Sequence, residues 1–121
     1  MKVYVLNDNA GFLVVCRLAL EARGHLVETS CDDTMIRADV LRFQPNVIIL
    51  DWRLQYRTGG QVLQELQTHV SSLPPVLAIS SLDSIEVEAL RCGAQAFLRK
   101  PFTDVALVNA VEALASGRTT P

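Results

Sequence analysis

The 121-residue sequence lacks a large excess of charge of either sign, because 13 aspartates and glutamates nearly balance its 11 lysines and arginines. The formal net charge of −2 gives no electrostatic footprint for nucleic acid or for an anionic membrane surface. We therefore expect no direct nucleic-acid binding by this domain, and a partner that is recognised in some other way.

Long apolar runs are also missing. No apolar stretch reaches the ~18 residues that a membrane-spanning helix needs. The amino terminus begins with the strand-like run Val3-Tyr4-Val5-Leu6 and shows no signal peptide. These absences favour a cytoplasmic protein without a membrane partner.

Cysteine and histidine are scarce. The three cysteines, Cys16, Cys31 and Cys92, are odd in number and show no C-x-x-C spacing, which suits a reducing compartment. Cys16 falls on the apolar side of a helical pattern, where a small buried hydrophobic residue is far more common than a redox centre. His25 and His69 lie far apart and beside no expected metal ligand, so we expect them to be surface residues.

A glycine-rich phosphate loop is absent as well. Gly59-Gly60 precedes no lysine and does not have the spacing of a P-loop or of a dinucleotide-binding turn. The sequence therefore gives no sign of a nucleotide site of either kind.

Polar residues instead stand at the ends of four strand-like apolar runs. These residues are Asp8, Asp51, Ser80 and Lys100. Nearly continuous apolar strands are typical of a parallel sheet that is covered by helices on both faces. Open sheets of this kind bind ligands at the carboxyl ends of their strands, so we expect the four side chains to meet at one edge.

Strand and helix patterns alternate along the whole chain. The predicted strands are Lys2–Leu6, His25–Thr29, Val47–Leu50, Val76–Ile79 and Ala96–Leu98. The first predicted helix follows Asn9 as its N-cap and stops at Gly24. The second and third helices span about Asp32–Phe43 and about Gln61–Val70. The fourth spans Ile85–Arg91 between an Asp83 cap and a Gly93 stop, and the fifth runs from Thr103 or Asp104 through Leu114. The predicted fold class is α/β, a doubly wound five-stranded parallel sheet with five helices.

Two details of this assignment concern burial. In the second helix we expect Met35, Ile36, Val40 and Phe43 to face the core. The segment Trp52–Gly60 is polar and is predicted to be an exposed loop.

Residues 1–116 are predicted to form one domain, and residues 117–121 have the composition of a tail or of the start of a linker.

The residues at the sheet edge suggest phosphoryl transfer. Asp8 and Asp51 are suited to hold a hard divalent cation, typically Mg²⁺. Lys100 supplies a compact positive charge for a carboxylate or a phosphoryl oxygen, and Ser80 supplies a hydroxyl donor. A carboxylate nucleophile, a metal and a cation together favour transfer of a phosphoryl group to Asp51. Each of these residues alone would more commonly be a cap, a turn residue or a salt-bridge partner.

Four motifs carry a likeness to a known family: an acidic residue after the first strand, V-I-I-L-D with Gly59 eight residues after Asp51, I-S-S at the fourth strand, and A-F-L-R-K-P-F at the fifth. In these motifs the chain resembles the receiver domain of bacterial two-component response regulators over essentially its whole length. The resemblance implies a flavodoxin-like topology. It also implies a switch that accepts a phosphoryl group from a sensor histidine kinase or a phosphotransfer protein.

The resemblance also implies roles for individual residues. Asp51 would be the phosphoacceptor, while Asp8, Asp51 and the main-chain carbonyl of Arg53 would hold Mg²⁺. Lys100 would contact the phosphoryl group, Ser80 would be the switch hydroxyl and Phe97 the aromatic switch residue. Such a domain is not an enzyme in the usual sense, because it catalyses only its own phosphorylation and dephosphorylation.

The sequence departs from the family pattern at four positions. Asn7 stands where a second acid is usual, Gln55 where proline is common, and Thr58 where an acid is common, while Arg53 places a long cation two residues after the acceptor. Asn7 is therefore expected to be only a weak metal ligand, and Mg²⁺ is expected to bind weakly.

Two other functions stay open at this point. The first is a phosphate-independent receiver that acts as an interaction or dimerisation module. The second, ranked last, is a small flavin-binding domain of the same topology, which the missing phosphate loop disfavours.

A homodimer is a further expectation, because the carboxyl half has more apolar helix positions than two short helices can turn toward one sheet: Ile85, Val87, Leu90, Val105 and Val108.

Overall fold

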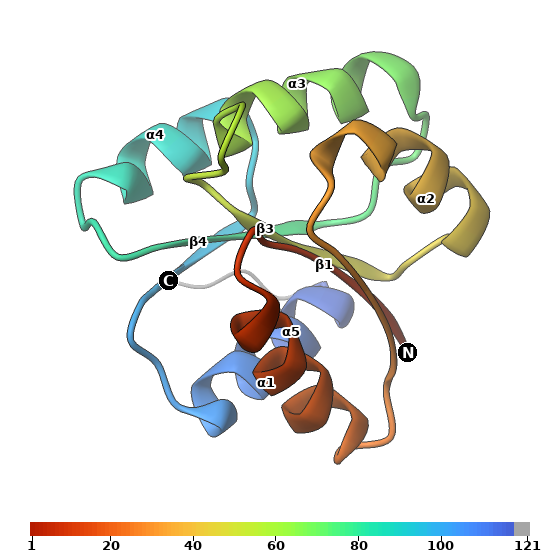
Figure 1. The fold of residues 1–121 in the computed structure, drawn as a ribbon, viewed down its shortest axis with the longest axis vertical. Helices are drawn as coiled ribbons and strands as arrows, with labels where there is room; N and C mark the ends of the chain where they lie inside the picture. Colours follow the sequence, from red (N-terminus) through yellow and green to blue (C-terminus); the bar gives the residue numbers. More distant parts are fainter. Residues whose placement is uncertain (118–121) are drawn as a thin grey trace.

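Five parallel strands form a single sheet in the order β2-β1-β3-β4-β5 in this computed structural model, which describes residues 1–117 (Figure 1). The strands are β1 (Lys2–Leu6), β2 (Leu26–Ser30), β3 (Val47–Asp51), β4 (Val76–Ser80) and β5 (Ala96–Arg99). The order places β3 in the centre between β1 and β4, and it brings the four polar-ended strands β1, β3, β4 and β5 side by side. The predicted fold is confirmed.

Helices cover both faces of the sheet. The helices α1 (Ala10–Glu21) and α5 (Asp104–Ala115) lie together on one face, and α2 (Ile36–Phe43), α3 (Gly59–His69) and α4 (Ile85–Cys92) lie on the other (Figure 1). A short 3-10 turn, η1 (Asp33–Met35), precedes α2. The side chains of successive strand residues alternate between the two layers, so that Val3 and Val5 pack toward α1 and α5 while Tyr4 and Leu6 pack toward α2 and α3.

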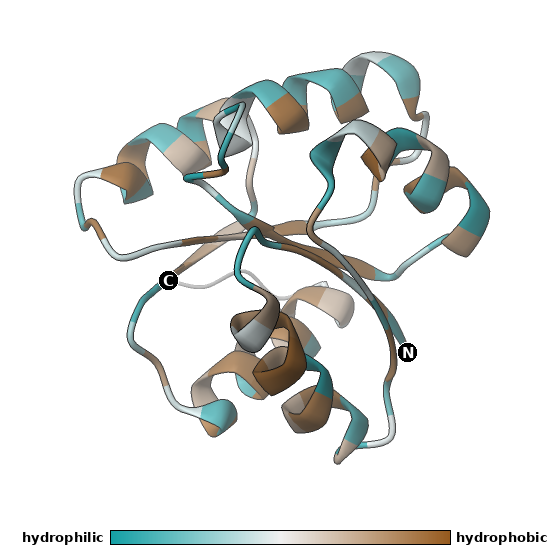
Figure 2. Cartoon of the chain, viewed as in Figure 1, coloured by the Kyte–Doolittle hydropathy of each residue, from teal (hydrophilic) through white to brown (hydrophobic). Residues whose placement is uncertain are grey.

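The burial of the strands follows from this two-sided cover. Every residue of β3 and β4 is buried, including the polar residues Asp51 and Ser80 at their ends. Figure 2 shows hydrophobic strands between helices that are mostly hydrophilic on their outer sides, apart from α1. The outward residues of α1 include Val14 and Leu18, which are 56% and 63% exposed. None of the helices within residues 1–117 is long and apolar enough to cross a membrane.

Several predicted boundaries and burials were wrong. Met35 was expected to face the core but is 49% exposed. The Asp32 side chain accepts from the Thr34 main-chain N–H and stabilises the 3-10 turn that contains Met35. The α-helix therefore starts only at Ile36. The segment Trp52–Gly60 is not an exposed loop throughout, since Trp52 is 2% exposed and α3 begins at Gly59. The fourth helix is preceded by Ser84 and has no side-chain cap from Asp83.

Other local predictions were confirmed. Asn9 and Thr103 cap α1 and α5 through their side-chain oxygens. Gly93 ends α4 with a φ of 114°, in the left-handed region that glycine adopts without strain. Cys16 is fully buried, and burial raises the pKa of its thiol to about 12, which keeps the thiol protonated as expected of a structural residue. The predicted tail lies outside the described residues apart from Gly117.

Candidate functional site

The side chain of Asp51 lies at the carboxyl end of the central strand β3, where it is 7% exposed. Three N–H donors hold its carboxylate. The Asn7 amide and the Lys100 ammonium donate to Oδ2 over 2.7 and 3.0 Å, and the Arg53 main-chain N–H donates to Oδ1 over 3.1 Å. A carboxylate held in this way is fixed in orientation and has its charge balanced by one cation.

Lys100 reaches Asp51 from the end of β5. Its ammonium lies 4.6 Å from the centre of the Phe12 ring, and Phe12 in turn meets Phe102 edge to face at 5.8 Å. The main-chain N–H of Lys100 donates to the Ser80 carbonyl over 2.8 Å, which ties the end of β5 to the end of β4. The Phe12 ring thus covers one side of the ammonium, which favours its attraction to Asp51.

Asn7 has a fixed amide orientation. Its Oδ1 accepts from the Asn9 main-chain N–H over 2.8 Å, while its Nδ2 donates to Asp51. Asn7 is 2% exposed, and turning its amide over would replace both hydrogen bonds by repulsive contacts. Asn7 therefore presents an N–H group, not an oxygen, to the acceptor carboxylate.

Asp8 is exposed beside this buried group. Its pKa is raised above the ordinary value, chiefly by partial desolvation and then by the negative charges of Asp51 and Asp33, against a lowering effect from a hydrogen bond with the Gln55 main chain. The charges of Asp51 and Asp33 make the potential at Asp8 negative, and this effect adds to the larger effect of desolvation.

Ser80 and Phe97 lie on the same side of the sheet. Ser80 is 1% exposed, and its hydroxyl accepts from the Leu82 main-chain N–H over 3.1 Å. Phe97 is half-buried and packs against the hydrophobic cluster beneath α3 and α4, in register with Ala78, two residues before Ser80. Both residues thus belong to the layer between the sheet and the helices α3 and α4.

Two of the residues that depart from the family pattern, Arg53 and Thr58, lie in the loop between β3 and α3. Thr58 caps α3, since its hydroxyl accepts from the Gln61 main-chain N–H over 3.1 Å and the Gln61 side chain accepts from the Thr58 N–H. Arg53 forms an isolated antiparallel bridge with Thr58, and its side chain is exposed. Among the ion pairs of the described residues none involves Arg53, so a pairing of this guanidinium with a carboxylate is not observed.

Sequence reasoning missed two anchors of this loop. Arg57 forms ion pairs with the buried Asp33 at 3.5 Å and with Glu65 at 2.6 Å, which ties the loop to the start of α2 and to α3. The indole N–H of Trp52 donates to a carboxylate oxygen of Glu88 on α4 over 2.6 Å. A lone tryptophan directly after the acceptor was the available signal for the second anchor, although its partner could not be predicted from sequence.

The oxygen atoms at this edge are of the chemical type that Mg²⁺ prefers as ligands. Asp8 and Asp51 supply carboxylates and Arg53 a main-chain carbonyl, and the negative potential at Asp8 favours a cation. Asn7 supplies no oxygen in the observed orientation. Within residues 1–117 no group of three or more His, Cys, Asp and Glu side chains is arranged to hold a metal ion, so a bound Mg²⁺ would depend on main-chain oxygen and retained water.

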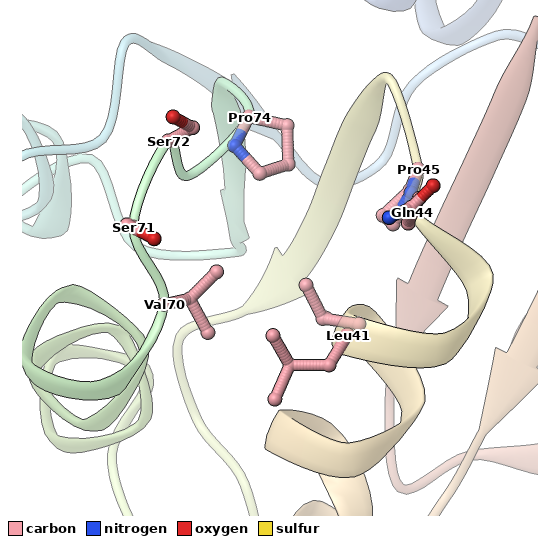
Figure 3. A pocket seen from close by; sticks show the side chains of 8 residues that line it. Leu41, Gln44, Pro45, Val70, Ser71, Ser72 and Pro74 are labelled. Carbon is pink, nitrogen blue, oxygen red and sulfur yellow. The ribbon is translucent and has the colours of Figure 1, made fainter.

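A separate hollow of about 230 Å³ lies at the opposite, amino-terminal edge of the sheet. Figure 3 shows Leu41, Gln44 and Pro45 at the end of α2 facing Val70, Ser71, Ser72 and Pro74 from the segment after α3. The hollow is smaller than most ligand sites and holds no charged side chain. It shares no residue with the cluster around Asp51.

Comparison with known proteins agrees with this geometry. The response regulator receiver domain family matches residues 3–112. The phosphate regulon transcriptional regulatory protein PhoB of Rhizobium meliloti is 31% identical over 121 residues, covering 93% of this chain and 51% of that protein. The C4-dicarboxylate transport transcriptional regulatory protein DctD of Pseudomonas aeruginosa is 29% identical over 111 residues, covering 91% of this chain and 24% of that protein.

Solved structures give the same result. The receiver domain of NtrX from Brucella abortus is 28% identical and superposes with a TM-score of 0.86, covering 94% of this chain and 98% of that one. The present chain spans about half the length of PhoB and about a quarter of DctD. The chain belongs to the family of response regulator receiver domains, the signalling modules of two-component systems.

Proposed function

We propose that this domain is a phosphorylation-dependent switch that accepts a phosphoryl group on Asp51 from a sensor histidine kinase or a phosphotransfer protein. The supporting observation is the buried Asp51 carboxylate, held by Lys100 and by two further N–H donors at the carboxyl edge of the sheet. A fixed carboxylate beside a single ammonium suits a nucleophile whose product carries additional negative charge.

In the proposed reaction a carboxylate oxygen of Asp51 attacks the phosphorus of a phosphohistidine. The phosphorus–nitrogen bond breaks, the phosphorus–oxygen bond to Asp51 forms, and the leaving imidazole takes up a proton. Lys100 then neutralises part of the charge on the new phosphoryl oxygens. Attack by water on the phosphorus later releases phosphate and restores the Asp51 carboxylate.

Asp8, Asp51 and the Arg53 carbonyl are the residues that would hold Mg²⁺, whereas Asn7 directs its N–H and not its oxygen toward Asp51. The metal would supply charge neutralisation for the transferred phosphoryl group. The domain's own residues orient the acceptor: Asn7 and the Arg53 N–H hold opposite oxygens of the Asp51 carboxylate and so fix its plane.

The output of the switch would be the face formed by α4, β5 and α5. A phosphoryl group on Asp51 would attract the Ser80 hydroxyl, and Phe97 would move into the space that Ser80 leaves. Val87, Leu90 and Val105 on this side of the molecule are 62%, 43% and 67% exposed, whereas Val108 is buried. These exposed side chains would form the surface for a homodimer, and sedimentation with and without a phosphoryl donor tests this surface.

A second candidate function is a phosphate-independent interaction module. The observation that favours it is the Asn7–Asp51 hydrogen bond, because it occupies the acceptor with a neutral donor where a metal-binding acid is usual. Incubation with Mg²⁺ and a small acyl phosphate, followed by intact-mass measurement, separates the two functions. A gain of one phosphoryl group supports the switch, and an unchanged mass supports the interaction module.

The relatives suggest the setting of the domain. PhoB and DctD are named as transcriptional regulatory proteins, and the present chain matches only part of each. We propose that this receiver likewise controls an effector in a cytoplasmic response regulator and does not itself contact DNA.

A further inference from the structure

The helix α4 is weakly anchored in the fold. It has eight residues, of which only Ala89 is fully buried. Ile85 is partly buried, while Val87 and Leu90 are exposed. A buried alanine contributes little hydrophobic stabilisation, which leaves room for the side-chain hydrogen bonds of α4, including that of the exposed Glu88, to influence the position of the helix.

The side chain of Trp52 connects the acceptor loop to α4. The indole is 2% exposed and lies against the start of α3, where a Cβ on Gly59 would come within 2.6 Å of Cε3. A Cβ on Gly60 would lie 3.3 Å from Cζ2, on the side where Cys92 of α4 approaches. The ring therefore fills the junction between α3 and α4, and its Nε1 donates to Glu88 over 2.6 Å.

Trp52 is also joined to the acceptor through its own main chain. Its N–H donates to the Ile79 carbonyl over 2.9 Å, and its carbonyl accepts from the Gly59 N–H over 2.9 Å. The next residue, Arg53, donates its N–H to Asp51 Oδ1. A displacement of the main chain at Asp51 is thus transmitted to a rigid ring that has little room to move.

We propose that the Trp52–Glu88 hydrogen bond couples the acceptor loop at Asp51 to the position of α4, with Glu88 acting as a positioning residue. The inference rests on the proposed function for its signal, the change of state at Asp51. The bond to the Glu88 carboxylate is charge-assisted and directional, so it is lost when the ring shifts. Since coupling between two sites is reciprocal, loosening α4 also alters the ease of modifying Asp51.

The first test measures amide hydrogen exchange in α4, relative to exchange in the core strand β4, without any phosphoryl donor. Glu88→Ala and Trp52→Phe are each expected to speed exchange in α4 by roughly threefold or more, because both remove the hydrogen bond. Glu88→Gln keeps an acceptor oxygen and is expected to lie closer to wild type. Glu86→Ala, an exposed position on the same helix, is the matched control and is expected to leave exchange unchanged.

A double-mutant cycle then tests the coupling itself. Asp51→Ala removes the acceptor of the Arg53 N–H and is expected to speed exchange in α4. Combined with Glu88→Ala, it is expected to add nothing beyond the larger single effect. Fully additive effects, or α4 exchange in Glu88→Ala equal to wild type, would overturn the proposal.

A phosphorylation experiment separates this inference from the proposed function. Glu88→Ala is expected to accelerate phosphorylation of Asp51 by a small acyl phosphate roughly three- to tenfold, because the cost of displacing α4 is removed. Equal rates in wild type and Glu88→Ala contradict the coupling. If no variant gains a phosphoryl group, the proposed function fails, and the exchange cycle still decides whether Trp52 and Glu88 couple the two regions.

Discussion

The Nδ2 of Asn7 donates to Oδ2 of Asp51 over 2.7 Å, so that the residue preceding Asp8 meets the acceptor through a neutral amide. Asn7→Asp would replace this donor by a carboxylate facing a carboxylate. We expect lower thermal stability without metal, because the two like charges repel. We also expect about tenfold tighter Mg²⁺ binding, because the site gains one negative charge.

Trp52 fluorescence is the readout for this comparison, since the chain has one tryptophan and it directly follows Asp51. Arg53→Ala in the Asn7→Asp background is expected to tighten Mg²⁺ binding further, by removing a nearby positive charge. Equal Mg²⁺ affinity in wild type and Asn7→Asp would show that the amide does not limit the metal site.

Lys100→Ala removes the only ammonium that contacts Asp51 in the described structure. We expect the fold to persist with a loss of about 1–2 kcal/mol, since the Lys100 side chain is 29% exposed and solvent partly screens the pair. Phosphorylation, where it still occurs, should no longer shift the NMR signals of Phe97. Arg99→Ala, which breaks an exposed ion pair with Asp83, is the control and should keep that response. A full Phe97 response in Lys100→Ala would remove Lys100 from the switch.

Gly59→Ala tests the close approach of α3 to Trp52. A Cβ at this position would lie 2.6 Å from Cε3 and 2.8 Å from Cα of Trp52, so either the ring or the main chain must shift. We expect a loss of about 2–3 kcal/mol in the free energy of unfolding, measured by denaturant titration. Gly11→Ala, whose nearest contact would be Asn9 Oδ1 at 3.2 Å, is expected to change the free energy of unfolding by less than about 1 kcal/mol, because the better helix propensity of alanine offsets this contact. Similar losses in both variants would argue against the tight junction.

The interaction of Glu112 with His25 is expected to make the stability of the domain depend on pH. The pKa of Glu112 is lowered, first by the hydrogen bond with His25 and further by Arg23 and by the amino terminus. A lowered carboxylate pKa contributes stability above the ordinary pKa near 4.5, and this contribution is lost as the pH falls through the folded-state value.

Glu112→Gln should therefore lower Tm slightly at pH 7, by about 1–3 °C, and the difference from wild type should vanish near pH 3. Thermal unfolding followed by circular dichroism at the two pH values measures both differences. A difference that stays constant down to pH 3 would exclude an ionic contribution from Glu112.

The strands of the sheet and their polar ends follow from the sequence pattern, whereas the strand order followed from the resemblance to receiver domains. The β3 run from Val47 to Asp51 is apolar up to its last residue, which indicates a central buried strand with a polar end. Asn9 and Thr103 have the residue types that cap helices, and Gly93 has the freedom that a helix end requires.

The errors arose where a local pattern was overridden by a specific contact. Trp52 lies in a polar segment, and its burial depends on two glycines and on Glu88, which is 36 residues away in the chain. The metal-binding role expected of Asn7 stays a prediction, and the orientation of its amide is set by Asn9 and Asp51 together, which no residue spacing reveals. Met35 was displaced from the core by a turn that the Asp32 side chain stabilises.

The central claim is that Asp51 accepts a phosphoryl group. Intact-mass measurement of wild type and Asp51→Asn, each incubated with Mg²⁺ and a small acyl phosphate, tests it most directly, and Asp8→Asn serves as a second variant that keeps the acceptor. We predict a gain of one phosphoryl group in wild type, a slower gain in Asp8→Asn and no gain in Asp51→Asn. An unchanged mass in wild type, or a gain in Asp51→Asn equal to that of wild type, would contradict the account.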